Sequence, residues 1–461
     1  MTPRSLRFGD LALYAVAMTL SIRWIATAAA AGPASLPLWG LAMIGYMVPL
    51  VIVSAELTSR FPGDGGLYTW TRDTLGPFPG FLSGWLYWVS NLPFFSGLLY
   101  FIVNALAMAA GPAAIERVRD PAVFVAVALG IAGLVTVLHL FGLGAGKWLA
   151  SFGAAATGVL LAALVVAGGA LAFRHGPATD FAHASYAPPL DADGAALWAS
   201  MVFAFGGPEA LAWLRNDVRG GVRQILRVLA VVAVVLVAAY VSGTLAILAI
   251  LRPAEASRLS GVPDALALSL TSLGLGALAP AALALLALSL LGGYSAWFGV
   301  AARLPFVVGV DRYLPAAFGH RGARTGAPVA AILVQTAAVV LLVLLGQAGA
   351  TVKGAYDFLV SMSVLSFTLP FVFLFVVFLK LQGRPVTPGE WTVPGGPAVG
   401  RIVGAVGLAV TLSAVACTLV PSSEATDKVA ALVKLVVSSG VLIAIGVAIY
   451  AVARFPVRRP V

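Results

Sequence analysis

The sequence predicts an all-α polytopic membrane protein. Three observations support this fold class: 61% of its 461 residues are hydrophobic, only 10% are charged, and the mean hydropathy is +1.00. A soluble protein is typically about 45–50% apolar and about 25% charged. A soluble fold of this length could not bury so much apolar side chain, because every folded chain exposes a large surface of its own. We therefore expect one transmembrane domain built from helices.

Charge-free runs in the chain predict twelve transmembrane helices. The hydrocarbon core of a bilayer is crossed by about 20 apolar helical residues. The apolar run 265–302 is too long for one crossing, so we expect Pro280 to separate a short surface helix from the span after it. The expected spans are 11–31, 35–57, 78–109, 122–142, 148–173, 195–213, 225–251, 279–301, 327–346, 356–379, 400–421 and 433–453.

Basic residues are divided unequally between the two expected sides of the membrane. With the N-terminus inside, nineteen of the 28 Lys and Arg residues fall on the inner side, eight fall on the outer side, and Arg23 lies within the membrane. This asymmetry predicts that both termini lie in the cytoplasm, and we expect the protein in the inner membrane. It also accounts for the formal net charge of +10 without nucleic acid as a partner. Four arginines after the sixth span are interpreted as topology signals that contact anionic membrane lipid: Arg215, Arg219, Arg223 and Arg227.

The N-terminal stretch has some features of a secretory signal, since Arg4 and Arg7 precede an apolar run and small residues at 26–31. We do not expect cleavage, because Arg23 interrupts the run and eleven further spans follow. The single cysteine, Cys417, excludes an internal disulfide and a cysteine-based metal cluster.

Two expected spans contain residues that interrupt a helix. The first has Ser21-Ile22-Arg23-Trp24 midway, and the sixth has Phe205-Gly206-Gly207-Pro208-Glu209. A helix broken inside a membrane is tolerated where the freed backbone lines a cavity or is buried in protein. Gly and Pro are also common in intact membrane helices, so one such element alone carries little weight. The pairing of two breaks, each with an ionisable residue, favours a binding site.

The breaks lie about 185 residues apart, a separation that fits the first helices of two inverted five-helix repeats. We predict the first repeat at 9–173, the second at 194–380, and two additional helices at 398–453. Freed N–H groups attract a carboxylate, and freed carbonyls attract an ammonium group. The predicted substrate-binding residues are Ser21, Ile22, Arg23, Trp24, Asn91, Phe203, Phe205, Gly206, Gly207, Tyr294 and Ser295.

Arg23 and Glu209 each leave two interpretations open. A guanidinium within a membrane needs a partner, and this partner is either the carboxylate of a substrate or an acidic side chain such as Glu209. Burial disfavours the charged form of Glu209, which would let it exchange a proton and couple transport to pH. The alternative is a permanently charged Glu209 that anchors Arg23. Glu56, by contrast, is expected to be structural and to pair with Arg60 one helical turn later.

Asn91, Tyr294 and Ser295 bring polar groups to the middle of the membrane. Tyr87, Trp88 and Trp297 add aromatic faces near them, a composition typical of small-ligand pockets. Aromatic side chains in apolar spans also serve in ordinary packing, so this interpretation remains open as well.

Three segments resemble the amino acid–polyamine–organocation transporters. Residues 55–62 (AELTSRFP) and 65–70 (GGLYTW) resemble the second-span signature of these proteins, in a form closest to the glutamate/GABA-antiporter branch. Residues 203–209 (FAFGGPE) resemble the sixth-span element, and residues 302–328 are similar to the loop after span eight. The resemblance implies a LeuT-like five-plus-five inverted repeat with two extra helices, and transport of amino acids or polyamines by alternating access.

The chain also departs from this family. Arg23 and Trp24 stand where the first-span break is usually small and glycine-rich, and the middle of span five lacks the lysine found in many sodium-independent members. Span eight offers Ser295 without a neighbouring hydroxyl, so we expect transport without sodium.

Enzyme signatures, a Walker motif and clustered metal ligands are absent from the sequence, so we expect no catalytic activity and no cofactor. The preferred function is a secondary transporter for amino acids. The alternatives are a polyamine or organic-cation carrier and a membrane receptor or scaffold that binds without flux.

Overall fold

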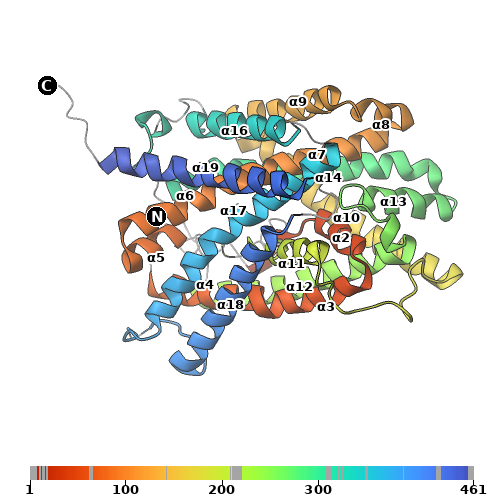
Figure 1. Cartoon of the computed structure of the whole chain (residues 1–461). Helices are drawn as coiled ribbons and strands as arrows, with labels where there is room; N and C mark the ends of the chain where they lie inside the picture. Colours follow the sequence, from red (N-terminus) through yellow and green to blue (C-terminus); the bar gives the residue numbers. More distant parts are fainter. Residues whose placement is uncertain are drawn as a thin grey trace.

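The computed structural model describes residues 8, 9, 12, 16, 19–61, 66–141, 143–207, 209, 221–307, 313–319, 322, 325–347, 351–387, 389–421 and 427–454. In this part of the chain, ten helical segments are long and apolar enough to cross a membrane. They match predicted spans two to five and seven to twelve. The chain is therefore a multi-pass helical membrane protein, shown as a ribbon in Figure 1.

Two of the ten segments join two α-helices end to end. The first combines η1 (Gly32–Ala34), α3 (Ser35–Ala42), the π-helical turn η2 (Met43–Met47) and α4 (Val48–Arg60). The second combines α6 (Pro77–Val89) and α7 (Asn91–Ala110). The other eight are α9 (Pro121–Leu140), α10 (Leu143–His175), α12 (Gly221–Ile250), α14 (Ala279–Ala301), α16 (Val329–Gln347), α17 (Val352–Leu381), α18 (Gly396–Thr418) and α19 (Lys428–Arg454).

Short helices connect these segments. Pro280 lies in the first turn of α14 and follows the surface helix α13 (Gly261–Ser272), so the predicted division of the run 265–302 is confirmed. The remaining elements are α5 (Gly66–Leu75), α8 (Pro112–Val118), η4 (Pro253–Glu255), η5 (Gly276–Leu278), α15 (Leu304–Val307) and η7 (Ala316–Gly319).

The first and sixth predicted spans contain the short helices α2 (Arg23–Ala30) and α11 (Ala192–Ala204). The chain is not helical at residues 20–21 and 206–207, so both predicted interruptions are present. Most of 11–18 in the first span, and residues 208 and 210–213 in the sixth, lie outside the described residues. The full length of these two spans therefore stays a prediction.

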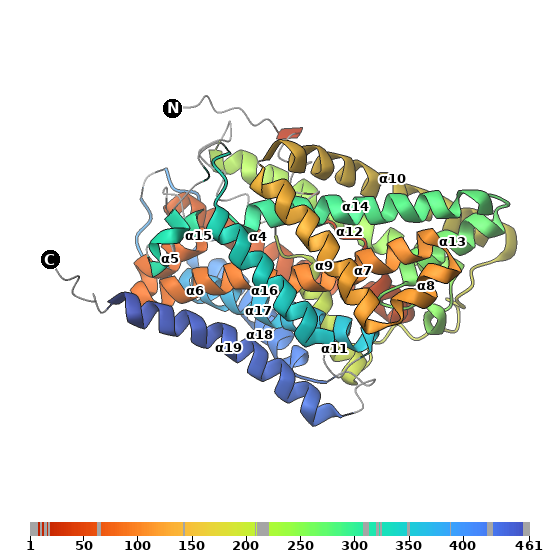
Figure 2. The ribbon, with the colours of Figure 1, turned by 90° about the horizontal axis from the view of Figure 1, so that it is seen from above.

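The helices differ in how much of their surface is covered by protein. Most of the α6–α7 segment and of α17 is buried, whereas only 28% of the α18 span and 22% of the α19 span are buried. Figure 2 shows α19 along one edge of the bundle. Apolar side chains such as Val429, Val437 and Val441 are exposed on α19, as expected for a helix that faces lipid.

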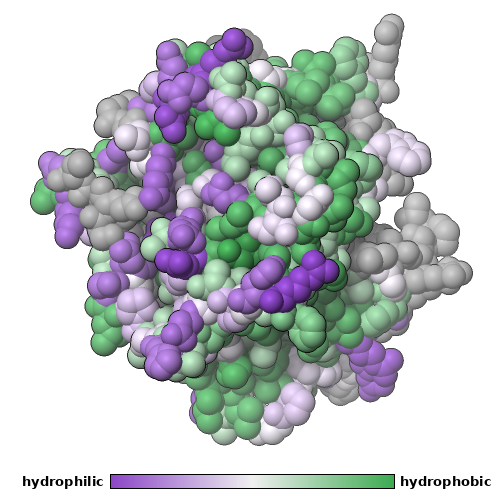
Figure 3. Space-filling view, turned by 90° about the vertical axis from the view of Figure 1, so that its right-hand side faces the viewer, coloured by the Kyte–Doolittle hydropathy of each residue, from purple (hydrophilic) through white to green (hydrophobic). Residues whose placement is uncertain are grey.

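The two ends of the bundle carry different loops. At one end, Arg60 of α4 donates to the carbonyl of Leu381, and Lys380 of α17 donates to that of Thr74. The opposite end carries α8 and α13, on the right of Figure 1. Figure 3 looks onto this second end, where hydrophilic residues are spread between hydrophobic ones.

Candidate functional site

The two helix breaks meet at the hydroxyl of Tyr240, a fully buried residue of α12. This oxygen lies 3.1 Å from the carbonyl oxygen of Thr19 and 3.1 Å from that of Ala204, so its single proton is donated to one of the two at a time. It also accepts a hydrogen bond from the backbone N–H of Ser21 at 3.4 Å. One side chain thus satisfies freed backbone groups of both interrupted helices. The ring of Trp39 stacks on Tyr240 at a centroid distance of 4.5 Å and fixes its position.

Arg23 begins α2, directly after the first break, and its side chain has no exposed surface. All three guanidinium nitrogens are buried without a hydrogen-bond partner among the described residues. The guanidinium lies over the rings of Trp24 and Phe94, at 4.3 Å and 4.6 Å from their centroids. Such contacts are worth about 2 kcal/mol when desolvated, whereas a buried charge without a counterion costs several kcal/mol. Arg23 is therefore a cation in need of an anion.

Glu209 follows the second break and is 5% exposed. One carboxylate oxygen accepts a hydrogen bond from the hydroxyl of Tyr87, and the other accepts one from the backbone N–H of Gly207, both at 2.8 Å. Gly207 has φ +116°, a conformation that residues with a side chain rarely adopt. The carboxylate therefore holds the turned backbone of the break. It makes no ion pair with Arg23, so that alternative is not realised in this structure.

Aromatic side chains close the space beside Arg23. The ring of Phe203 lies 5.3 Å from that of Trp24, 6.2 Å from that of Phe94 and 4.8 Å from that of Phe367 on α17. A Cβ on Gly206 would overlap the ring of Phe367, so only glycine leaves room for this ring at the break. The site thus combines one buried cation with an apolar, aromatic wall.

Other predicted site residues are occupied by contacts between or within helices. Phe205 packs on Trp39 and Tyr240, with centroids 5.7 Å and 5.6 Å away. The Asn91 amide donates to the carbonyls of Tyr87 and Trp88, across the joint between α6 and α7. Ile22 is buried in the core, while Ser21 offers its backbone to Tyr240.

The two predicted residues of α14 face neighbouring helices. Tyr294 packs on Phe95 at 5.2 Å, and its hydroxyl has no hydrogen-bond partner among the described residues. Ser295 lies beside His139 of α9, whose Nε2 is 2.9 Å from the Ser295 carbonyl oxygen and 3.2 Å from its hydroxyl. The structure thus gathers Ser21, Arg23, Trp24, Phe203, Gly206, Gly207 and Glu209 at the breaks, and places Tyr294 and Ser295 in helix packing.

Three residues near the breaks were not predicted from the sequence: Tyr240, Phe94 and Phe367. Tyr240 could have been identified, because it is a polar aromatic residue in the middle of the apolar run of α12. Phe94 and Phe367 could not, because aromatic residues are numerous in these helices and nothing distinguishes these two. Among the described residues, no three His, Cys, Asp or Glu side chains gather closely enough to hold a metal ion.

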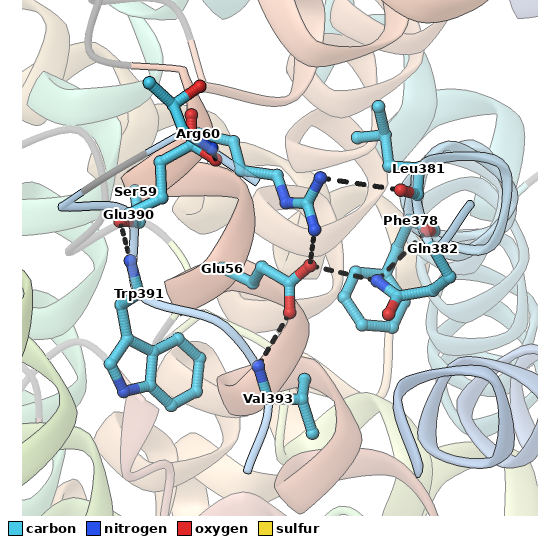
Figure 4. Close-up of polar contacts among 10 residues, drawn as sticks. Glu56, Ser59, Arg60, Phe378, Leu381, Gln382, Glu390, Trp391 and Val393 are labelled. Atoms are coloured by element: carbon cyan, nitrogen blue, oxygen red, sulfur yellow. Dashed lines mark hydrogen bonds and ion pairs between the residues drawn. The ribbon is translucent and has the colours of Figure 1, made fainter. Parts of the chain in front are cut away.

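Glu56 lies elsewhere, at the end of α4 that approaches Leu381, and it is structural as predicted (Figure 4). One carboxylate oxygen accepts from Arg60 at 2.8 Å and from Gln382 at 3.0 Å, and the other accepts from the backbone N–H of Val393 at 2.8 Å. The side chain of Ser59 accepts from the Trp391 N–H at 2.6 Å. These bonds tie α4 to the segment between α17 and α18.

Comparison with known proteins identifies the family. A family model described as amino acid permease matches residues 6–450. The chain is 25% identical to an uncharacterized transporter of Legionella pneumophila over 386 residues, which cover 83% of this chain and 82% of that protein. It is 28% identical to an uncharacterized transporter of Mycobacterium tuberculosis over 338 residues, covering 72% and 71%.

A relative with a named substrate class is the probable agmatine/putrescine antiporter AguD of Lactococcus lactis. It is 21% identical over 397 residues, which cover 86% of this chain and 84% of that protein. Three findings agree with one another: ten segments in the described part of the chain that match predicted spans, two interrupted helices that meet at one side chain, and a family match over nearly the whole length. The chain belongs to the amino acid permease family and is a transporter of the amino acid–polyamine–organocation superfamily.

Proposed function

We propose that this protein is a secondary transporter that carries an amino acid across the inner membrane by alternating access. The observation that carries the proposal is Arg23, a fully buried guanidinium at a helix break whose three nitrogens have no hydrogen-bond partner in the described part of the chain. A carboxylate would supply the missing charge and accept two parallel hydrogen bonds from the planar guanidinium. The N-terminal end of α2, where Arg23 lies, adds a positive helix dipole that favours the same anion.

The aromatic wall suits the rest of an amino acid. Phe94, Phe203 and Phe367 offer apolar faces within one cluster, and such faces bind hydrocarbon or aromatic side chains. Aromatic faces also attract an ammonium group. The proposed substrate-binding residues remain those predicted, centred on Ser21, Arg23, Trp24, Phe203 and Gly206, with Tyr240, Phe94 and Phe367 added.

We also propose twelve transmembrane helices in a five-plus-five inverted repeat with two additional helices and both termini cytoplasmic. The contact of Tyr240 with both interrupted helices supports this arrangement, since inverted-repeat transporters bring their broken helices together at the substrate site. Glu209 is the proposed proton-coupling residue. Its bonds to Tyr87 and Gly207 support that role, because a change in its protonation would act directly on the break in the sixth span.

A polyamine carrier is the second candidate, and the similarity to the agmatine/putrescine antiporter AguD favours it. Glu209 is a carboxylate that could attract an amine. Its two oxygens, however, already accept hydrogen bonds, and the cation of Arg23, which pairs with no acid among the residues that the structure describes, would repel a polycation. The balance of charge therefore favours a substrate with a carboxylate.

An uptake screen with the purified full-length protein in liposomes tests the proposal. Individual radiolabelled amino acids and polyamines are offered to vesicles loaded with the same unlabelled compound, so that a carrier exchanges them while a receptor or scaffold does not. We expect exchange of one or a few amino acids and none of putrescine. Exchange of polyamines alone would establish the second candidate, and binding without exchange would exclude a carrier.

A further inference from the structure

Tyr46 is a fully buried residue in the middle of the second span, and its hydroxyl has no hydrogen-bond partner among the described residues. It lies on the π-helical turn η2, a rare local geometry that is frequent at functional sites. Buried hydroxyls in native proteins nearly always have a partner, because burial removes their bonds to water. The packing of the helices does not account for this hydroxyl.

Tyr46 lies beside the carboxylate of Glu209. Its ring packs against Phe371 of α17 at a centroid distance of 6.0 Å, and the ring of Tyr87 packs against the same Phe371 at 6.2 Å. Tyr87 donates to Glu209 at 2.8 Å. Tyr46 interacts electrostatically with both Glu209 and Tyr87. The Tyr46 hydroxyl thus stands close to the carboxylate without bonding to it in this structure.

The other surroundings of Glu209 supply no further titratable partner in the part of the chain that the structure describes. On this side α17 contributes phenyl rings, which pack on Tyr87. Arg23, at the neighbouring break, makes no ion pair with Glu209 among the described residues. Its electrostatic partners are Tyr240 and Tyr356. Tyr46 and Tyr87 are therefore the titratable side chains that face the carboxylate.

The hydrogen bonds of Glu209 differ between its charged and protonated forms. In the charged form both oxygens are satisfied, by Tyr87 and by the Gly207 N–H. A proton taken up from solvent turns one oxygen into a donor, which needs an acceptor. If this donor bonds to the Tyr87 oxygen, Tyr87 must donate its own proton to another acceptor. By either route one more acceptor is required, and the oxygen of Tyr46 has lone pairs to offer.

We propose that Tyr46 is the positioning residue that stabilises protonated Glu209, by accepting the additional hydrogen bond either directly or through Tyr87. The charged form is held by Tyr87 and Gly207, and the protonated form recruits the π-helical turn of the second span. The two forms therefore engage different parts of the site, which is what allows a proton to favour one access state over the other. The inference rests on the proposed role of Glu209 in proton coupling and adds a residue to it.

The pH profile of exchange tests this assignment in liposomes that contain the full-length protein, with an equimolar mixture of radiolabelled neutral amino acids. Tyr46→Phe keeps the ring contacts with Phe371 and Phe375 and removes a hydroxyl without a partner in the described part of the chain, so the fold should persist. We expect the midpoint of the profile to move toward acid by about 0.5–1 pH unit, because the protonated form loses its acceptor. Tyr87→Phe should move the midpoint in the opposite direction, since the charged form loses a donor.

Tyr100→Phe is the matched control. Tyr100 is also fully buried, but its hydroxyl bonds to Val343 and Gln347 of α16, so the midpoint should stay in place. Infrared difference spectra between acid and neutral pH give a second readout that does not require transport. The C=O stretch of protonated Glu209 is identified by its loss in Glu209→Gln. It should move to higher wavenumber in Tyr46→Phe, because a carboxyl group that loses a hydrogen-bond acceptor has a stronger C=O bond.

An unchanged midpoint and an unchanged infrared band in Tyr46→Phe would overturn the assignment. A midpoint that moves toward alkaline pH would also overturn it, since Tyr46 would then be a donor to the charged carboxylate. Proton coupling is judged separately, because a loss of pH dependence in Glu209→Gln supports it whatever Tyr46 does. If exchange by the wild type is independent of pH, coupling fails, while the infrared band still decides whether Tyr46 bonds to the protonated carboxyl group. Absence of any Glu209 band at acid pH would overturn both.

Discussion

Arg23 and Glu209 stand at the two helix breaks of one site, yet they do not pair with each other. Glu209 accepts its two hydrogen bonds from Tyr87 and Gly207, while the guanidinium of Arg23 contacts the rings of Trp24 and Phe94. The two charges therefore have separate tasks. Glu209 holds the backbone of one break, and Arg23 remains available for an anion that comes from outside the chain.

Glu209→Gln should remove the pH dependence of transport. The wild-type rate of exchange is expected to change between about pH 5 and about pH 8, because the protonated and charged forms of Glu209 favour different access states. A glutamine can still accept from the Gly207 N–H and bond to the Tyr87 hydroxyl, so the fold should persist. Tyr87→Phe is the companion variant, which removes one bond but keeps the carboxylate and should keep the pH dependence. An active Glu209→Gln protein with an unchanged pH profile would exclude the proton-coupling role.

Transport should not require sodium. Two of the hydroxyls of α14 are engaged in contacts between helices: Ser289 bonds with Thr157 of α10, and Ser295 bonds with His139 of α9. These side-chain oxygens are therefore not displayed toward a cation. Uptake measured after replacement of sodium by choline should equal uptake in sodium, and a collapse of uptake in choline would overturn this expectation.

Tyr240→Phe should destabilise the protein and impair binding. The change removes the hydroxyl that serves Thr19, Ser21 and Ala204 at both breaks, and an unsatisfied buried polar group costs about 1–3 kcal/mol. Tyr294→Phe is the matched control, because Tyr294 is equally buried but its hydroxyl has no hydrogen-bond partner within the described ranges. Thermal unfolding of the two variants in the same detergent gives the comparison. Equal Tm values would show that Tyr240 does not stabilise the joined breaks.

Glu56→Gln should lower stability without changing which substrate is carried. The carboxylate serves Arg60, Gln382 and the Val393 N–H, and it is 1% exposed. Removal of one member of a buried ion pair costs about 3–5 kcal/mol, because the other charge is left without a partner.

The exposed pair of Glu116 with Arg119 has the same 2.8 Å separation, with side chains 71% and 72% exposed, so Glu116→Gln should cost less than about 1 kcal/mol. Thermal unfolding of both variants distinguishes the pairs. A Glu56→Gln protein as stable as Glu116→Gln would mean that the contacts in Figure 4 contribute little.

The sequence alone predicted ten of the transmembrane segments and both helix breaks, because apolar runs, charges and Gly-Pro elements act locally. It also predicted the Glu56–Arg60 pair, whose members are one helical turn apart. It did not predict which helices face each other. Ser295 was placed in a binding site because it lies mid-membrane, but its neighbour is His139, 156 residues away.

For the same reason the sequence did not predict the contact of Tyr240 with Thr19, which is 221 residues away in the chain. Rotation of a helix about its axis decides such contacts, and a helix that is apolar on all sides carries little periodicity from which to infer it. The spacing of the two breaks, about 185 residues, related the first and sixth spans to each other, but it carried no information on which side chain joins them.

Binding of the amino acid identified by the uptake screen to Arg23→Lys and Arg23→Gln tests the central claim most directly. Lysine keeps the charge but loses the planar pair of donors, and glutamine loses both. Arg252→Gln, a change at an exposed arginine outside the site, serves as the control. If Arg23 binds the substrate carboxylate, calorimetry on folded protein should show an affinity lower by about tenfold or more for Arg23→Lys, about 1.4 kcal/mol, and a larger loss for Arg23→Gln. Affinities of both variants close to that of the wild type would contradict the account.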